Sequence, residues 1–131
     1  MKPLILFFLL MIPAFGRLGE TLEQCRVRYG KETKVLQEKP VVRLFRKDGF
    51  DLSITFAKEV ARQILVTRTP DAAGSRGKDL AEAEAKAFLE ANGNGSPWVS
   101  EFGGMMYSTK DGQRSATKDK ESLLMAFDSD L

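Results

Sequence analysis

Hydrophobic and polar residues alternate most clearly between Phe50 and Phe56. Apolar residues occupy every second position of this segment, and polar residues stand between them. Such alternation predicts a strand with one buried face and one face in solvent. Lys47-Asp48-Gly49 comes just before the segment and predicts a hairpin turn, because glycine accepts a positive φ without a steric cost.

Shorter apolar runs predict further strands on both sides of this segment. One run covers residues 41–46 and another covers residues 60–67. Three weaker candidates follow later in the chain, over residues 104–109, 113–118 and 122–127. Val35-Leu36 offers one more short strand in a polar stretch, and we leave it outside the expected total of about six.

Capping signals predict two helices. Thr21 and Gln24 have the spacing of a capping box, and Gly30 ends the same segment. Asp79 begins an Ala-rich and Glu-rich run that ends at Asn92, where the sequence Asn-Gly-Asn-Gly stops a helix.

Together these elements predict an α+β fold. We expect an antiparallel sheet of about six strands with two helices on one face, in the order α-β-β-β-α-β-β-β. A single domain is expected over residues 17–131, with a first unit over 20–68, a linker over 69–78 and a second unit over 79–131. The Lys-Asp-Gly turn occurs in both units. The sequence therefore leaves open a degenerate duplication beside plain reuse of turn chemistry.

Residues 1–16 have the features of a secretory signal peptide. Lys2 supplies a basic start, and a continuous apolar run extends from Leu4 to Ile12. This run is shorter than the roughly twenty residues that a membrane-spanning helix needs. We expect cleavage near Gly16, export to a periplasm or the medium, and no stable transmembrane anchor. Cleavage after Gly19 and a buried N-terminal helix or strand are the alternatives.

Composition removes most familiar catalytic chemistry. The 131 residues include no His and one Cys. This excludes a His-dependent triad, a His/Cys zinc site and a disulfide within the chain. We expect neither catalytic residues nor a metal or cofactor. Carboxylate-only chemistry is the alternative, on acidic pairs such as Asp48/Asp51 or Asp128/Asp130.

Cys25 is the single thiol of the chain. It follows Leu22 and precedes Tyr29 at a spacing that places all three on one face of a helix. We therefore expect burial of Cys25 as a small apolar side chain. A disulfide with another chain is the alternative.

Charge is divided unevenly along the sequence. The chain has a net charge of +2, yet residues 17–68 contain 12 basic and 7 acidic residues, and residues 69–131 contain 7 basic and 11 acidic residues. We interpret Arg43, Arg46 and Lys47 as a candidate basic patch for weak contact with an anionic surface. The alternative is that the two halves complement each other electrostatically. Nucleic acid is not expected, because no strand interleaves aromatic and basic residues.

A second group of residues suggests a protein contact. Trp98 is the only Trp, and it is followed by Met105, Met106 and Tyr107 after two glycines. Aromatic residues and Met are adaptable contact residues, although both also fill cores. We take these four residues as the candidate partner-binding site.

Several short motifs recur in a group of small exported bacterial proteins of unknown function, which this chain resembles. They are Arg28-Tyr29-Gly30, the turn and alternating strand from Lys47 to Phe56, the helix from Asp79 to Asn92, and Trp98. More distantly, a short helix that ends in Gly before antiparallel strands is similar to SmpA/OmlA-type small lipoproteins and β-lactamase inhibitor proteins. The chain lacks the lipobox and the cysteine pairs of those families.

The resemblance implies a protein-binding module rather than an enzyme. We therefore expect a small periplasmic or secreted binding module that contacts an envelope or secreted protein. A carboxylate-based envelope hydrolase and a purely structural envelope protein are the alternatives.

Overall fold

The computed structural model describes residues 17–70 and 79–127. Within this part of the chain, each half has one helix followed by four strands. The first half contains α2 (Leu22–Tyr29), β1 (Lys34–Glu38), β2 (Val41–Lys47), β3 (Phe50–Ala57) and β4 (Val60–Arg68). The second half contains α3 (Glu82–Ala91), β5 (Trp98–Glu101), the 3-10 turn η2 (Phe102–Gly104), β6 (Met106–Thr109), β7 (Arg114–Lys118) and β8 (Ser122–Phe127).

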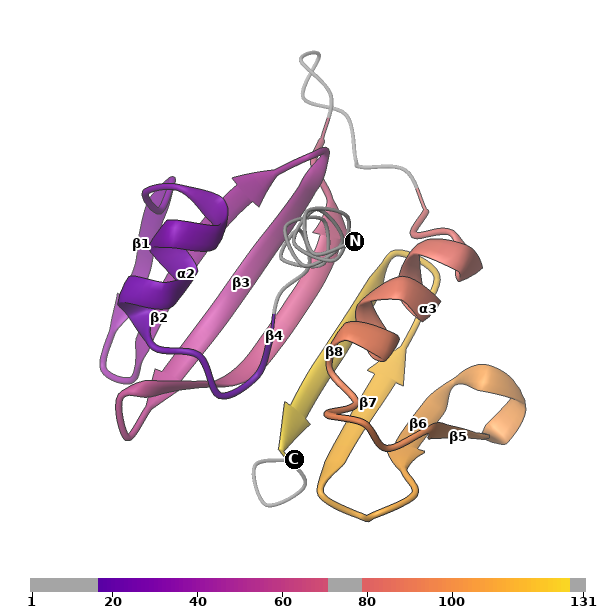
Figure 1. The fold of residues 1–131 in the computed structure, drawn as a ribbon. Helices are drawn as coiled ribbons and strands as arrows, with labels where there is room; N and C mark the ends of the chain where they lie inside the picture. Colours follow the sequence, from indigo (N-terminus) through magenta and orange to yellow (C-terminus); the bar gives the residue numbers. More distant parts are fainter. Residues whose placement is uncertain (1–16, 71–78, 128–131) are drawn as a thin grey trace, which may run out of the picture.

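All eight strands form one antiparallel sheet in the order β1-β2-β3-β4-β8-β7-β6-β5. The halves meet where β4 pairs with β8, with Ile64 opposite Met125 and Val66 opposite Leu123. All four of these side chains are fully buried. Figure 1 shows α2 and α3 over the same face of the sheet, one on each half. The sheet therefore has two edge strands, β1 and β5, at its opposite ends.

The predicted fold class is wrong in its strand number, its order and its balance of elements. The sheet has eight strands instead of about six, and of the described residues 47% are in strands and 20% in helices. The two strands outside the prediction are β1 and β5, which are the edge strands. Edge strands bury little apolar surface, and every residue of β1 is exposed. Their sequences therefore lack the alternation that identifies a half-buried strand.

The predicted alternating strand is confirmed as β3. Leu52, Ile54 and Phe56 are buried, and the residues between them are partly exposed. Ile54 lies opposite Ile64 of β4. Because partners in an antiparallel pair point to the same face, the buried side chains continue across the sheet beneath the helices.

Two-residue turns connect the central strands. Asp48 and Gly49 have φ values of 54° and 87°, and Lys58 and Glu59 have φ values of 54° and 69°. Positive φ at both positions matches the right-handed twist of the strands that such turns connect. The sequence identified the first turn through its glycine, whereas Lys58-Glu59 adopts the same conformation without one.

The helix ends differ in how well the sequence predicted them. Around α2, Thr21 Oγ1 accepts the Gln24 amide and Gln24 Oε1 accepts the Thr21 amide, so the expected capping box is confirmed. Helix α3 begins three residues after Asp79. There, Glu84 Oε1 accepts the Ala81 amide at 2.9 Å.

Asn92 connects the start of the described chain to α3. Its side chain is fully buried. Its Oδ1 accepts the Leu18 amide at 2.7 Å, and its Nδ2 donates to the Phe88 carbonyl at 2.9 Å. The next amide, that of Gly19, donates to the Ala61 carbonyl of β4. The segment before α2 is therefore held between the two halves.

Two further contacts join the halves. The Phe50 and Phe88 rings meet edge to face with centroids 5.1 Å apart. Beside them, Arg68 of β4 forms an ion pair with Glu84 of α3. These contacts come from β3, β4 and α3, so the helix of the second half packs against strands of the first.

Two of the sequence predictions lie outside the described residues. They are the signal peptide over residues 1–16 and most of the linker, residues 71–78.

Replacement of Asn92 tests its role in connecting the Leu18 segment to α3. Asn92→Ala leaves the Leu18 amide buried without its acceptor, and we expect the free energy of unfolding to fall by about 2 kcal/mol. Urea unfolding followed by circular dichroism measures the change. Asn94→Gly is the matched control in the same loop, because Asn94 is exposed and has a φ of 52° that glycine accepts. A loss in Asn92→Ala no larger than that in the control would contradict the role of Asn92.

Candidate functional site

The distal hairpin, residues 98–109 with β5, η2 and β6, contains all four residues of the predicted protein contact. Trp98 and Tyr107 are partly buried, and Met105 and Met106 are 63% and 41% exposed. The hairpin also exposes Phe102, at 73%, and Val99, at 45%. The sequence analysis did not select these last two. An aromatic residue followed by Gly103-Gly104 was the available signal for an exposed turn.

Register divides the hairpin side chains between the two faces of the sheet. Ser100 pairs with Tyr107, whose neighbour on β7 is the buried Ala116, so this pair faces the helices. Glu101 pairs with Met106, and this pair faces away from the helices. The four predicted residues are thus close in the chain but do not share one face.

A left-handed turn forms the tip of the hairpin. Phe102, Gly103 and Gly104 have φ values of 53°, 68° and 88°. The conformation suits glycine and costs roughly 1–2 kcal/mol at a residue with a Cβ. Phe102 therefore occupies an unfavourable backbone conformation while its ring remains exposed.

Trp98 anchors the base of the hairpin to α3. Its Nε1 donates to the Leu89 carbonyl, and its ring packs against the core. A Cβ at Gly93 would lie 3.2 Å from Nε1 and 2.6 Å from the Ser96 carbonyl oxygen, so a side chain at position 93 would displace this contact. Part of the Trp98 side chain therefore stabilises the fold and is not exposed to a partner.

A groove of about 760 Å³ lies between α3 and the hairpin. Trp98, Ser100 and Tyr107 line it from the hairpin. Glu82, Lys86 and Glu90 line it from α3. These three helix residues recur at every fourth position, and the sequence analysis did not select them as site residues.

The predicted basic patch does not form one cationic surface. Arg43 and Lys47 are on the strand positions that face the helices, and Arg46 is on the opposite face. Arg46 pairs with Asp51 at 2.8 Å, and Lys47 Nζ donates to the Arg28 carbonyl at 2.8 Å. The structure therefore does not bring these three side chains together.

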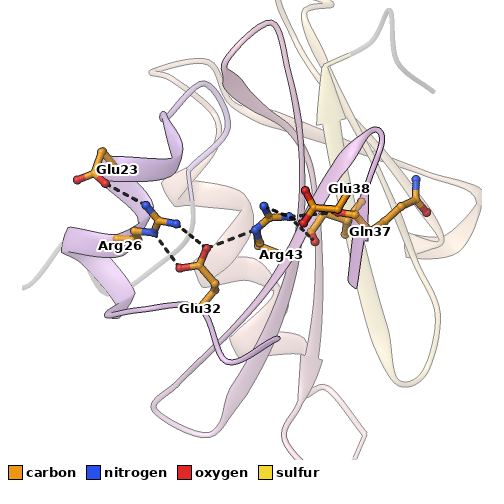
Figure 2. Close-up of polar contacts among 7 residues, drawn as sticks. Glu23, Arg26, Glu32, Gln37, Glu38 and Arg43 are labelled. Atoms are coloured by element: carbon orange, nitrogen blue, oxygen red, sulfur yellow. Dashed lines mark hydrogen bonds and ion pairs between the residues drawn. The ribbon is translucent and has the colours of Figure 1, made fainter. Parts of the chain in front are cut away.

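Arg43 belongs to an ion network that connects α2 with β1 and β2. Figure 2 shows Glu32 between Arg26 and Arg43. Arg26 donates to both oxygens of Glu32, at 2.8 and 2.9 Å. The Arg43 side chain is mostly buried, lies 3.4 Å from both Glu32 and Glu38, and donates to the Gln37 carbonyl. The charge of Arg43 therefore stabilises the packing of these elements.

Glu32 is strongly acidic in this network. The hydrogen bonds from Arg26 are the largest effect on its pKa, which they lower to about 2 against the opposing effect of burial. Arg28 likewise pairs with Glu20, so the pairs of Arg26, Arg28, Arg43 and Arg46 all lie within the first half. Among the ion pairs named here, Arg68–Glu84 joins the halves.

The carboxyl groups with shifted pKa values do not suit a general acid. Burial by itself raises the pKa of Asp51, but hydrogen bonds from Arg46 and Thr69 more than offset it and leave the pKa below its usual value. The pKa of Asp111 is lowered by the Thr109 hydroxyl, and that of Asp119 by the Glu121 amide. A general acid needs a raised pKa. The pair Asp128/Asp130 lies outside the described residues.

The predicted burial of Cys25 is confirmed. Its side chain is 1% exposed. Burial raises the pKa of its thiol to about 12, with a smaller contribution from Glu20. Because the thiolate is the reactive form, Cys25 is poorly placed for nucleophilic chemistry or for a disulfide with another chain.

Within the described residues, His, Cys, Asp and Glu side chains form no group of three or more that could hold a metal ion. In the same part of the chain, no helix has the length and hydrophobicity that crossing a bilayer requires.

Comparison with known proteins identifies a similar fold. No family model matches the chain, and no curated protein matches it in sequence. The crystal structure of a cysteine-rich secretory protein from Staphylococcus aureus is similar, with a TM-score of 0.50 and 12% sequence identity. The match covers 87% of this chain and 46% of that structure, so the chain spans about half its length. At this identity the similarity concerns the fold alone.

These comparisons do not bear on the other resemblances. The likeness to small exported bacterial proteins, to SmpA/OmlA-type lipoproteins and to β-lactamase inhibitor proteins stays a prediction.

Removal of the Glu32 charge tests the ion network. In the folded protein the pKa of Glu32 lies below its ordinary value of 4.5, so its contribution to stability is present above that pH and is lost as the pH falls toward about 2. We expect Glu32→Gln to lower the free energy of unfolding by about 1–3 kcal/mol at neutral pH. The difference from the parent should shrink below pH 4.5 in urea unfolding at a series of pH values.

Glu23→Gln is the matched control for this test. Glu23 pairs with the same Arg26, but its side chain is 79% exposed, and exposed pairs contribute under about 1 kcal/mol. A Glu32→Gln deficit that is equal to that of the control, or that does not change with pH, would contradict the role of Glu32.

Thiol labelling tests the burial of Cys25. At neutral pH, a thiol reagent such as dithionitrobenzoate should react with native protein only as fast as the protein unfolds, because the thiol is buried and protonated. In concentrated guanidinium chloride, one thiol per chain should react at once. Rapid labelling of the native protein would show that Cys25 is accessible.

Proposed function

We propose that the chain is a small exported binding module that contacts another protein of the envelope or the medium through the distal hairpin. The observation that carries the proposal is the grouping of Val99, Phe102, Met105 and Met106 as exposed apolar side chains on one short segment. Clustered exposed apolar residues mark contact surfaces, and aromatic residues and Met are enriched in protein interfaces.

The conformation of the hairpin supports a contact role. Its base is fixed by Trp98 against α3, and next to its tip the Lys118 amide donates to the Met105 carbonyl at 2.8 Å. Its tip holds Phe102 in a left-handed conformation with the ring exposed. Unfavourable backbone conformations are enriched at functional sites. A fixed base also lowers the entropy that binding would cost.

The hydrolase alternative has less support. Glu82 and Glu90 both line the groove, but they are eight residues apart on one helix, which is roughly 12 Å along the axis. Paired catalytic carboxyl groups of glycosidases are about 5–9.5 Å apart. The purely structural alternative does not account for the exposed apolar tip.

Site-specific crosslinking in the native cells tests the proposal. We expect a photoreactive phenylalanine analogue at position 102 or 105 to crosslink to one defined protein, because these side chains are exposed at the proposed contact. The same analogue at Lys58, which is exposed in the turn between β3 and β4, should not give that product. Mass spectrometry identifies the product. Equal products from position 58, or no product from the hairpin, would contradict the proposal.

Substitutions in the hairpin then test its contribution to affinity for the purified partner. Phe102→Asn removes the ring and places at φ 53° a residue that tolerates this conformation. We expect stability to be retained and affinity to fall by about tenfold or more. Val27→Ser is the matched control, because Val27 is an 86% exposed apolar residue on α2. An equal loss in both variants would contradict a contact through the hairpin.

A further inference from the structure

Strand β5 is an open edge of the sheet. It is last in the strand order, and within the described residues it pairs with β6 alone. The opposite edge is different, because β1 has a bulge between Val35 and Gln37 and carries charged residues at both ends. Bulges and charges are features that protect an edge from pairing with another chain. Strand β5 pairs with β6 in regular register throughout its length.

Two residues of β5 direct their main-chain groups to this open edge. The Pro97 carbonyl accepts the Lys110 amide at 2.9 Å, so position 97 is hydrogen-bonded toward β6. In an antiparallel pair the main-chain groups of successive residues point to alternate sides. The main-chain groups of Val99 and Glu101 therefore also point toward β6, whereas those of Trp98 and Ser100 point away from it. Their amides and carbonyls are available to a further strand.

The groove lies beside the same edge, on the helix side. It is lined by Pro97, Trp98 and Ser100 along the edge and by α3 across from it. A strand added to β5 would place every second side chain on the helix side, directly at the groove. The intervening side chains would lie on the other face, beside Val99 and Met106. The edge and the groove thus form one continuous surface.

Charge favours a basic side chain in this groove. Carboxylates from Glu82 and Glu90 line it together with Lys86. Beside Ser96 and Pro97, Asp111 adds negative charge and Lys110 adds positive charge. Carboxylates therefore outnumber ammonium groups around the edge. The Trp98 and Tyr107 rings add aromatic surface that suits the stem and the charge of Lys or Arg.

We propose that the edge of β5 binds an extended segment of the partner protein as a ninth, antiparallel strand. The main chain of this segment pairs with Trp98 and Ser100. A Lys or Arg side chain of the segment enters the groove, and its apolar neighbours lie against Val99 and Met106. This assignment rests on the proposed function and names the part of the partner that the hairpin region binds.

A peptide probe tests the assignment directly. Trp98 is the single Trp of the chain, so its fluorescence reports on the groove. We expect the peptide Thr-Val-Arg-Val-Arg-Val-Thr to change this fluorescence in a saturable way at concentrations up to about millimolar, the weak end of measurable affinity. The same peptide with Glu in place of Arg should bind at least about tenfold more weakly, and so should a version N-methylated at both Arg amides. No binding by the Arg peptide, or equal binding by all three peptides, would overturn the proposal.

Ser100→Pro tests strand addition by changing the protein instead of the peptide. Proline removes an outward amide while leaving the hydrogen bonds to β6 in place, and proline is tolerated on edge strands. We expect the Arg peptide to bind this variant at least about tenfold more weakly, and to bind Val27→Ser, changed at an exposed position of α2, as it binds the parent. The N-methylated peptide provides the same test without a variant if Ser100→Pro does not fold. Undiminished binding to folded Ser100→Pro would overturn strand addition.

Two further results separate this assignment from the proposed function. A crosslinked partner that binds Ser100→Pro as tightly as the parent would leave the hairpin contact standing and overturn the strand addition. The contrary result is sedimentation as a dimer that Ser100→Pro abolishes. In that case the edge belongs to a second copy of this chain, and the partner segment is excluded.

Discussion

The pairing of β4 with β8 is the interaction on which the rest of the structure depends. Each half alone would be a four-stranded sheet with an apolar strand at its edge. Pairing Ile64 with Met125 and Val66 with Leu123 covers both of these edges at once and buries these four side chains completely. The same pairing fixes which strands remain at the outside. Strands β1 and β5 become the edges of the complete sheet because β4 and β8 are joined.

The helix layer reinforces this junction with polar and aromatic contacts. Asn92 holds the Leu18 amide, and the Phe50 and Phe88 rings meet across the two halves. Most of the arginines of the first half are neutralised nearby by their own carboxylates, as Arg26 and Arg43 are by Glu32 (Figure 2). Part of the positive charge of this half therefore holds α2 on the sheet. The second half carries the exposed apolar tip and the groove, at the edge farthest from that network.

The candidate site combines a fixed base with an exposed tip. Trp98 shows how one residue serves both, because its indole nitrogen bonds to α3 while part of its surface lines the groove. Gly93 makes this contact sterically allowed, and Gly103 and Gly104 let the chain turn at the tip. Trp98, Met105, Met106 and Tyr107 were predicted from residue type alone. Phe102 and the carboxylates of α3 were not predicted, because an exposed ring and a helix face look the same in sequence whether or not a groove lies beside them.

The sequence by itself determined the local features whose cause is local. The alternation from Phe50 to Phe56, the Asp48-Gly49 turn, the capping box at Thr21 and the burial of Cys25 follow from neighbouring residues, and each was predicted. Tertiary structure decided the rest. Strand β5 exists because β6 supplies its hydrogen bonds, and Arg43 is structural because Glu32 reaches it from another segment. These outcomes depend on partners in other elements, and hydrophobic periodicity does not encode which partners will meet.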